Sequence, residues 1–316
     1  CVIKTWKGRI SLKFIHMADM HFDMPFTVLN NRNKLGEKRR LEQRDVFKKC
    51  INYVKQNNIP YLFIAGDLYE QEYVKQSTIE FINNLFKEIP NTLIYIAPGN
   101  HDPYLLNSVY YNFEWNENVH IFNKLEKIKV NNDINIYGYG FSDFYERNSE
   151  INNIELDEKE KINILVVHGS LDSGYDDNRE YNPLTYKYLK EIGFDYIALG
   201  HIHKRYISED NRLVYPGSMI SMGFDELGEH GMIVGDVQKD NTNLEFIKLD
   251  NTEFVEYELD ISSIYTQEDL IEKINQINWN NNRMYKIILI GYRRFDINVI
   301  NIKKLIDIEN IIKIKD

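Results

Sequence analysis

The sequence contains few cysteines, and none of its apolar runs is long. Cys1 and Cys50 match neither a disulfide framework nor a structural zinc site, so we expect a reducing, cytoplasmic location. No run approaches the roughly 20 apolar residues of a membrane span, and the N-terminus shows no apolar signal-peptide core. With only 16 glycines and 7 prolines, a collagen-like or linker-rich chain is excluded. We therefore expect a globular protein that does not enter membranes.

Positive charge is also scarce, with 38 lysines and arginines against 48 aspartates and glutamates and a net charge of −10. This balance argues against indiscriminate, charge-driven binding of nucleic acid, although it leaves room for a local basic surface. Hydrophobic residues make up 43% of the 316 residues, which is ample material for a core. A chain of this length is expected to form one large domain with an appendage, or two domains.

Five short apolar runs each end in a polar or glycine-rich turn, and we predict each run to be a buried strand. The runs are residues 12–17, 61–65, 92–97, 162–167 and 194–199. Helical periodicity over residues 41–56 and 78–89 separates the early runs, which is typical of an α/β domain. The expected buried face of the first helix holds Leu41, Val46, Phe47, Ile51 and Val54. In such sheets ligands bind beyond the carboxyl ends of the strands.

The later part of the chain is richer in strand patterns, and a domain boundary is predicted near Asn251. Beyond it, strand, helix and strand patterns over residues 253–261, 268–278 and 284–292 indicate a small βαβ-type unit. We expect residues 12–250 to form the main domain and residues 251–316 a small C-terminal domain. That domain is expected to be truncated, because its last residues show no clear closing element. Residues 1–11 are expected to be an N-terminal extension or a remnant of cloning.

Histidines gather in the turns that follow the predicted strands, where five of the eight histidines lie. The turn motifs are Asp19-x-His21, Gly66-Asp67, Gly99-Asn100-His101-Asp102, His168-Gly169 and Gly200-His201-x-His203. Side chains at positions i and i+2 point the same way in an extended chain, so the D-x-H and H-x-H pairs can bind one region from two sides. Mixed imidazole and carboxylate ligands suit manganese, iron or zinc, whereas magnesium and calcium prefer oxygen ligands.

This pattern predicts a two-metal centre for phosphate chemistry. One carboxylate can bridge two cations, and Asp67 on its glycine turn is the natural candidate. Two ions about 3.5–4 Å apart polarise a phosphate and activate a water between them. His101 follows the potential ligand Asn100 and is a candidate general acid toward the leaving oxygen, with Asp102 holding its tautomer and orientation.

The ordered motifs resemble those of the calcineurin-like metallophosphoesterases, and longer stretches are similar to the SbcD/YhaO-like DNA repair exonuclease family. The similar stretches include IAPGNHDP, LVVHGSLDSG, YIALGHIHKR and VYPGSMISMGFDELGEHG, and the resemblance runs from about Leu12 to Asp250. It implies a four-layer α/β/β/α sandwich with a small α+β C-terminal cap domain. It also places Tyr215-Pro216-Gly217-Ser218 at the rim of the active site. One departure concerns GDLYEQEY, where Tyr69, Glu70 and Tyr73 stand in place of a histidine that contacts the phosphate in some relatives.

The resemblance also implies a role for each ligand. One ion would take Asp19, His21, Asp67 and His203, and the other would take Asp67, Asn100, His168 and His201. The ions would most often be Mn²⁺, with iron or zinc as alternatives. The expected substrate is DNA with single- or double-stranded ends, and the expected partners are an SbcC-like ATPase and a second copy of the chain.

Basic residues near the predicted site are candidate contacts to nucleic-acid phosphates. Residues 32–49 carry eight positive and three negative charges, which makes Arg39 and Arg40 candidates. A solvated helix face with intrahelical ion pairs is an equal alternative for this segment. Lys204 and Arg205, which directly follow the last ligand motif, are the other candidates.

The sequence is compatible with three functions. The leading hypothesis is a two-metal phosphodiesterase that cleaves DNA. The second keeps the chemistry but takes a cyclic nucleotide or another small phosphoester, which the acidic balance of the chain favours. The third is a non-catalytic module that binds metal and DNA ends for a partner, and the complete ligand set argues against it.

Overall fold

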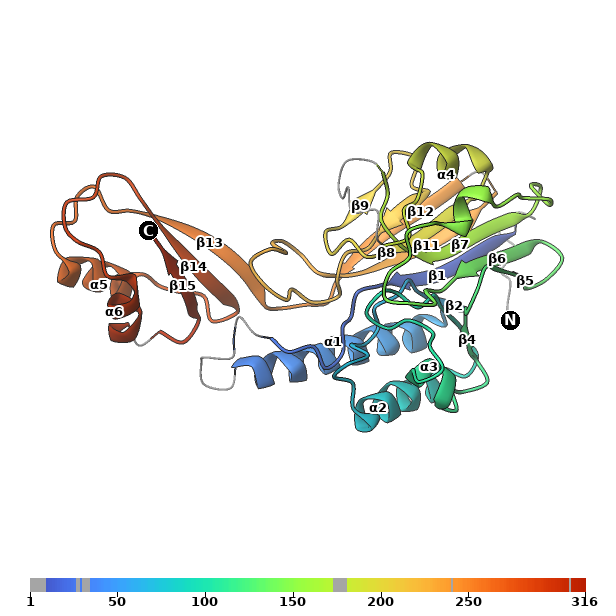
Figure 1. Cartoon of the computed structure of the whole chain (residues 1–316), viewed down its shortest axis with the longest axis horizontal. Helices are drawn as coiled ribbons and strands as arrows, with labels where there is room; N and C mark the ends of the chain where they lie inside the picture. The colour runs from blue at the N-terminus through green and yellow to red at the C-terminus, as the bar shows by residue number, and fades with distance from the viewer. Residues whose placement is uncertain (1–9, 27–28, 30–34, 173–180, 240, 307) are drawn as a thin grey trace. The chain divides into compact units, whose positions relative to one another are not determined.

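The computed structural model describes residues 10–26, 29, 35–172, 181–239, 241–306 and 308–316 (Figure 1). Residues 1–9 of the expected N-terminal extension lie outside this description, as do Arg32 and Lys34 of the basic segment. In the described ranges, no helix combines the length and the apolar character that crossing a membrane requires.

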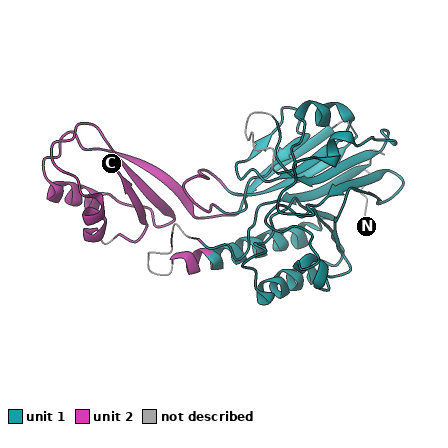
Figure 2. Ribbon diagram, in the orientation of Figure 1, with its two compact units in different colours: residues 1–25, 40–220, 230–249 teal, residues 26–39, 221–229, 250–316 magenta. Residues whose placement is uncertain are grey.

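The chain divides into two compact units (Figure 2). Unit 1 holds residues 1–25, 40–220 and 230–249, and unit 2 holds residues 26–39, 221–229 and 250–316. The predicted boundary near Asn251 lies beside the last change of unit, between Leu249 and Asp250. The two earlier segments of unit 2 could not be predicted from the sequence, because only tertiary contacts assign them to this unit.

The first sheet of unit 1 has the strand order β12-β11-β1-β2-β3-β4. Four parallel strands form its main part: β1 (Ser11–Met17), β2 (Tyr61–Ile64), β3 (Leu93–Ile96) and β4 (Val119–Ile121). A hairpin of β11 (Gly231–Gln238) and β12 (Asn241–Lys248) pairs antiparallel with β1. The connections include α1 (Leu35–Asn57), α2 (Gln76–Lys87) and the short α3 (Val109–Asn112). The predicted alternation of strand and helix is confirmed.

The second sheet of unit 1 has the order β5-β6-β7-β8-β10-β9. Its strands are β5 (Glu126–Lys129), β6 (Ile134–Tyr139), β7 (Ile162–His168), β8 (Tyr196–Gly200), β9 (Tyr206–Ile207) and β10 (Leu213–Tyr215). Strands β6, β7, β8 and β10 run parallel. A 3-10 helix (Glu150–Asn153) and α4 (Tyr186–Ile192) belong to its connections.

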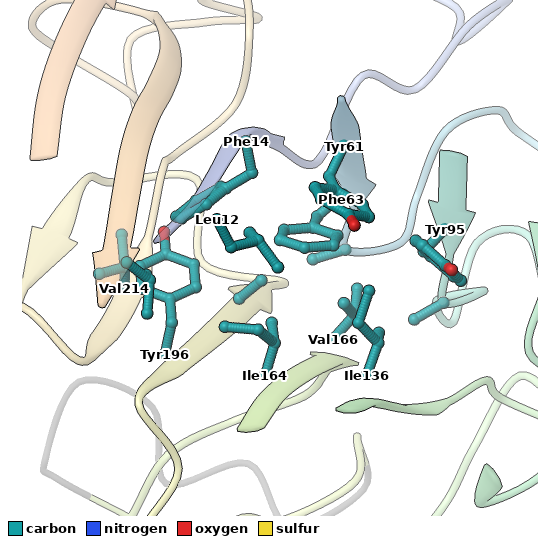
Figure 3. Packing of buried hydrophobic residues seen from close by; sticks show 14 of the residues in the cluster. Leu12, Phe14, Tyr61, Phe63, Tyr95, Ile136, Ile164, Val166, Tyr196 and Val214 are labelled. Atoms are coloured by element: carbon teal, nitrogen blue, oxygen red, sulfur yellow. The ribbon is translucent and has the colours of Figure 1, made fainter. Parts of the chain in front are cut away.

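The two sheets pack face to face around one apolar core (Figure 3). Phe14 and Phe63 from the first sheet meet Val166 and Tyr196 from the second, and the rings of Phe14 and Tyr196 lie 4.5 Å apart. A second apolar cluster joins the outer face of β7 and β8 to α4. Helices α1 and α2 lie along the outer face of the first sheet (Figure 1). The predicted four-layer α/β/β/α sandwich is therefore confirmed.

The helix pattern was wrong at one position. Leu41 was expected on the buried face of the first helix, but its side chain is 64% exposed. Val46, Phe47, Ile51 and Val54 are buried as predicted. Leu41 lies five residues before Val46, and five residues correspond to about 500° of helix rotation, which carries it beyond the edge of the apolar stripe.

His16 links the two sheets inside the core of unit 1. In one tautomer its Nε2–H donates to the carbonyl of Leu199 at 3.1 Å, and its Nδ1 accepts from the Tyr196 hydroxyl at 2.8 Å. Burial lowers the pKa of His16 to about 3, although the contact with Leu199 opposes the shift. His16 is therefore a neutral core residue at physiological pH.

Unit 2 contains a three-stranded parallel sheet in the order β13-β14-β15. Its elements alternate along the chain: β13 (Glu253–Asp260), α5 (Gln267–Gln276), β14 (Arg283–Ile290), α6 (Val299–Leu305) and β15 (Ile311–Lys315). Leu270 and Ile302 of the helices pack with Ile287 and Ile311 of the sheet. The βαβ prediction is confirmed. The last residues, where no clear closing element was expected, form α6 and β15, and the expected truncation of this domain stays a prediction.

Candidate metal centre

The five turns that carry the predicted ligands converge at one edge of the sandwich in unit 1. Each turn follows the carboxyl end of a parallel strand, and these ends share one edge of each sheet. The two sheets are joined there directly. The His201 amide donates to Asp19 Oδ1 at 3.0 Å, and the His168 Nδ1–H donates to the Ala65 carbonyl at 2.9 Å.

Three groups of potential ligand atoms form at this edge, and within each group the atoms lie within 4.8 Å of one another. The groups are Asp19, His21 and His203; His21, Asp67 and His101; and Asp19, Asp67 and His168. Asp19, His21 and Asp67 each belong to two of these groups, so the three groups overlap in one cluster. The structure also brings Asn100 into the cluster, with its Oδ1 3.1 Å from His168 Nε2. The ring of His201 lies 5.2 Å from that of His168.

The histidine orientations fit metal binding. The Nδ1–H of His21 donates to Glu70 at 2.7 Å, which turns its Nε2 toward His203 Nε2 at 3.1 Å and Asp67 Oδ2 at 3.6 Å. His168 follows the same rule, since its Nδ1 is held by a carbonyl and its Nε2 lies 3.3 Å from Asp67 Oδ2. A fixed Nδ1 hydrogen bond of this kind orients the imidazole ligands of metal sites.

The buried carboxylates also fit a cationic occupant. Asp19 and Asp67 are almost fully buried, and neither forms an ion pair with a lysine or arginine of the described residues. Burial raises the pKa of Asp19, although His203 and His168 oppose the shift. Burial disfavours the charge on His168 as well, but Asp67 outweighs it and raises the pKa of His168 to about 9. A proton thus compensates Asp67 in the metal-free protein, and metal binding would release it.

Glycines let the loops approach one another where a side chain would not fit. Gly66 has φ of +86°, and a Cβ there would lie 2.4 Å from His168 Nδ1. A Cβ on Gly99 would lie 2.2 Å from Asp67 Oδ1. Asp19, His21 and Asp67 themselves adopt positive φ angles of 51°, 46° and 51°, which are uncommon for residues other than glycine. Such strained positions concentrate at functional sites.

His101 lies beside this cluster, but its orienting partner is Glu70. Glu70 accepts from His101 Nδ1 at 2.9 Å with one oxygen and from His21 Nδ1 at 2.7 Å with the other. Burial works against the charge on His101, but the hydrogen bond to Glu70 outweighs it and raises the pKa of His101 to about 9. The His101 side chain is 45% exposed, so a substrate can reach it. The sequence signal was Glu70 itself, three residues after Asp67 in GDLYE.

The predicted role of Asp102 as the partner of the His101 ring was therefore wrong. The Asp102 carboxylate accepts hydrogen bonds from the amides of Gly99, Asp67 and Leu68 at 2.7, 3.0 and 2.6 Å. It also accepts from the Tyr110 hydroxyl at 2.7 Å. Burial and the neighbouring Asp67 raise the pKa of Asp102 to about 7. Asp102 positions the two loops that carry Asp67 and His101 rather than the imidazole.

The YPGS segment positions two further ligand loops. The Tyr215 hydroxyl donates to the Gly169 carbonyl at 2.7 Å and accepts from the Leu171 amide at 3.2 Å. The Ser218 amide donates to the His203 carbonyl at 3.1 Å. These contacts give a physical basis for the expected position of this segment at the active-site rim.

The basic residues predicted to contact nucleic acid differ in their surroundings. Arg39 is 1% exposed, and its guanidinium pairs with Asp250 and donates to the Ser221 carbonyl at 2.8 Å, so its predicted contact with a phosphate was wrong. Arg40 is half-buried, whereas Lys204 and Arg205 are exposed. The Arg205 guanidinium lies 3.7 Å from the centre of the Phe246 ring, a cation–π contact that leaves it at the surface.

The double-sheet sandwich and the carboxylate–imidazole cluster at its edge define a metal-dependent hydrolase of phosphoester bonds. Residues 12–205, more than half of the chain, match the family described as calcineurin-like phosphoesterase, and the chain belongs to that family. The donor set fits two divalent metal ions.

The chain is similar to two known proteins. The uncharacterized metallophosphoesterase YhaO of Bacillus subtilis (strain 168) is 29% identical over 246 residues, which is 74% of this chain and 60% of that protein. The chain thus spans less than two thirds of this relative. The crystal structure of a dimetal phosphatase from Danio rerio is similar with a TM-score of 0.42 and 9% sequence identity, covering 75% of this chain and 99% of that one.

Proposed function

We propose that the protein hydrolyses phosphodiester bonds in DNA with two divalent metal ions, of which Mn²⁺ is preferred. The observation that supports this proposal is the overlap of the three ligand groups in one largely buried cluster, together with His101, whose side chain is 45% exposed. A metal cluster beside an accessible acid combines two groups that promote phosphodiester cleavage.

The proposed ligand sets follow the groups at the sheet edge. One ion would be held by Asp19, His21, Asp67 and His203, and the other by Asp67, Asn100, His168 and His201. Two such ions polarise a phosphate and lower the pKa of a water. The donors combine imidazole and carboxylate, which supports manganese, iron or zinc over magnesium.

His101 is proposed to protonate the leaving oxygen. Its pKa of about 9 keeps the imidazole protonated at physiological pH, so it can donate a proton without first acquiring one. Glu70 holds Nδ1 through its hydrogen bond, which directs Nε2 away from Glu70. Glu70 thereby fixes both the protonation and the orientation of the acid.

DNA as the substrate rests on the resemblance to the SbcD/YhaO-like family and on the accessibility of His101. The same resemblance supports an SbcC-like ATPase partner, a homodimer and a cytoplasmic location as further proposals. Lys204, Arg205 and Arg40 are retained as proposed phosphate contacts.

A small phosphoester is the second candidate substrate. The net charge of −10 favours it, as does the loss of Arg39 from the proposed DNA contacts. Labelled single-stranded and duplex DNA, incubated with Mn²⁺, Mg²⁺ or a chelator, separate the two. The proposal is supported if the protein cleaves DNA with Mn²⁺ and if His101→Ala abolishes this cleavage while the metal content is retained. Turnover of a small diester without cleavage of either DNA would favour the second candidate.

A further inference from the structure

Two tyrosine rings extend outward from the metal centre of unit 1. The Tyr181 ring lies 5.2 Å from the ring of His201, and the Tyr145 ring lies 5.9 Å from that of Tyr181. The two tyrosine rings are stacked, with an angle of 25° between their planes. Tyr145 is 55% exposed, so it offers solvent a large part of an aromatic surface only two ring contacts from a proposed ligand.

A buried carboxylate fixes the segment that carries Tyr145. Glu146 is buried, and one of its oxygens accepts from the Ser142 amide at 2.8 Å and the Ser142 hydroxyl at 3.1 Å. Its other oxygen accepts from the Tyr139 hydroxyl at the end of β6. The sheet thus anchors Glu146, and Tyr145 next to it is held at the surface.

The segment that carries Tyr181 is tied to the metal centre itself. Tyr181 and Glu146 form a parallel backbone bridge, in which the Asn182 amide donates to the Glu146 carbonyl at 2.6 Å. The Asn182 side chain donates to the His168 carbonyl at 2.7 Å, and the Ser170 amide donates to the Tyr181 carbonyl at 3.0 Å. The stacked pair is therefore built on the same backbone that presents His168.

We propose that Tyr145 stacks on the nucleobase adjacent to the phosphate being cleaved. This inference rests on the proposed function, because Tyr145 would bind the base next to the phosphate that the metal centre holds. Every base has a π-face, so one rigid tyrosine binds bases without selecting their sequence. A base must leave its helical stack to reach the ring, and the protein therefore prefers unpaired nucleotides to intact duplex.

Two chromogenic diesters with one leaving group test the base contact: thymidine 5′-(p-nitrophenyl phosphate) and methyl p-nitrophenyl phosphate. The wild-type protein is expected to have a higher kcat/KM for the thymidine diester, and Tyr145→Ala is expected to lower that value about 5- to 100-fold. Its kcat/KM for the methyl diester is expected to stay within about twofold of wild type. Tyr145→Phe keeps the ring and is expected to retain the preference for the thymidine diester.

Tyr111→Ala is the matched control, because Tyr111 is 53% exposed and packs on Tyr104 rather than on a ring beside a proposed ligand. The inference is overturned if Tyr145→Ala lowers turnover of both diesters equally, or if Tyr111→Ala lowers the thymidine preference as much. The absence of metal-dependent turnover of either diester would instead refute the phosphodiesterase. A thymidine preference without cleavage of DNA would retain the base contact while assigning the site to small nucleotides.

Discussion

Two buried carboxylates in this protein have opposite surroundings. In unit 2, Asp250 pairs with the buried guanidinium of Arg39 and also accepts the amides of Ser221 and Thr252 at 2.9 and 3.0 Å. In unit 1, Asp67 is just as buried, but it faces imidazoles and the His101 amide instead of a fixed cation. A buried charge is costly unless it is paired. The pair in unit 2 is thus complete within the chain, whereas the cluster in unit 1 is completed by metal ions.

Replacing Asp67 is expected to have the largest effect of all. Asp67→Asn should reduce phosphodiester turnover at least about 1,000-fold, because both ions lose their shared ligand. The same variant should make the metal-free protein less stable than wild type at neutral pH, since the protonated His168 loses the carboxylate that compensates it. Metal content, turnover and urea unfolding in the presence of chelator measure these effects. A metal-free variant more stable than wild type would contradict the compensation of Asp67 by the proton on His168.

Breaking the pair in unit 2 should affect stability rather than chemistry. Arg39→Ala is expected to lower the free energy of unfolding by about 3–5 kcal/mol, because it leaves Asp250 buried without its partner. Arg40→Ala, at the half-buried neighbouring position, is the control and should cost about 1 kcal/mol or less. Denaturant unfolding of both variants gives the comparison, and equal stability of the two would refute a structural role for Arg39.

A methyl group on Gly99 should weaken metal binding without a change of ligand. Its Cβ would lie 2.2 Å from Asp67 Oδ1, so Gly99→Ala must displace the bridging carboxylate. We expect metal affinity to fall about 10- to 100-fold, as for other losses of support around metal ligands. Gly223→Ala is the matched control, since a Cβ there meets nothing within 4 Å. Calorimetric titration with Mn²⁺ should separate the two variants, and unchanged affinity in Gly99→Ala would count against the assigned position of Asp67.

Removing the charge of Glu70 should shift the pH dependence of turnover. The protonated form of His101 is the proposed acid, so kcat falls as pH rises through the pKa of His101, which is about 9 in the metal-free protein. Because the hydrogen bond to Glu70 raises that pKa, Glu70→Gln should move the alkaline limb of the kcat profile down by about one pH unit or more. An alkaline limb that stays in place would show that another group controls it.

His16 provides a third case, a buried titratable group with uncharged partners. Its folded-state pKa of about 3 lies below the ordinary value of 6.5, so between these values the unfolded chain binds more protons. Stability is therefore lost as pH falls below about 6.5, by about 1 kcal/mol between pH 6.5 and 5.5 from this residue. Unfolding of wild type and His16→Gln at both pH values measures the difference. A pH dependence unchanged by the substitution would contradict a neutral His16.

The sequence was informative wherever a pattern is local. Apolar runs predicted β1, β2, β3, β7 and β8 to within two residues at either end, because each strand is buried on both faces and ends in a turn. The turn motifs predicted which residues meet, since the carboxyl ends of parallel strands share an edge. The sandwich fold was predicted from the family resemblance and not from the pattern of apolar runs.

Non-local partners could not be predicted in the same way. Arg39 belonged to a basic helical segment, and nothing in that segment indicates Asp250, which lies 211 residues away. Asp102 follows His101 directly in the sequence, whereas Glu70 lies 31 residues before it, and only the geometry assigns the imidazole to Glu70. Nothing in the sequence indicated that Tyr145 and Tyr181 stack, because contacts between loops follow no sequence periodicity.

The most direct test of the two-metal account is a titration of chelator-treated protein with Mn²⁺, followed by bound metal and by phosphodiester turnover on the same samples. The account predicts two bound ions per chain and turnover that appears with them, while Asp67→Asn binds neither ion tightly and stays inactive. Saturation at one ion per chain with full turnover, or full turnover in Asp67→Asn, would contradict it.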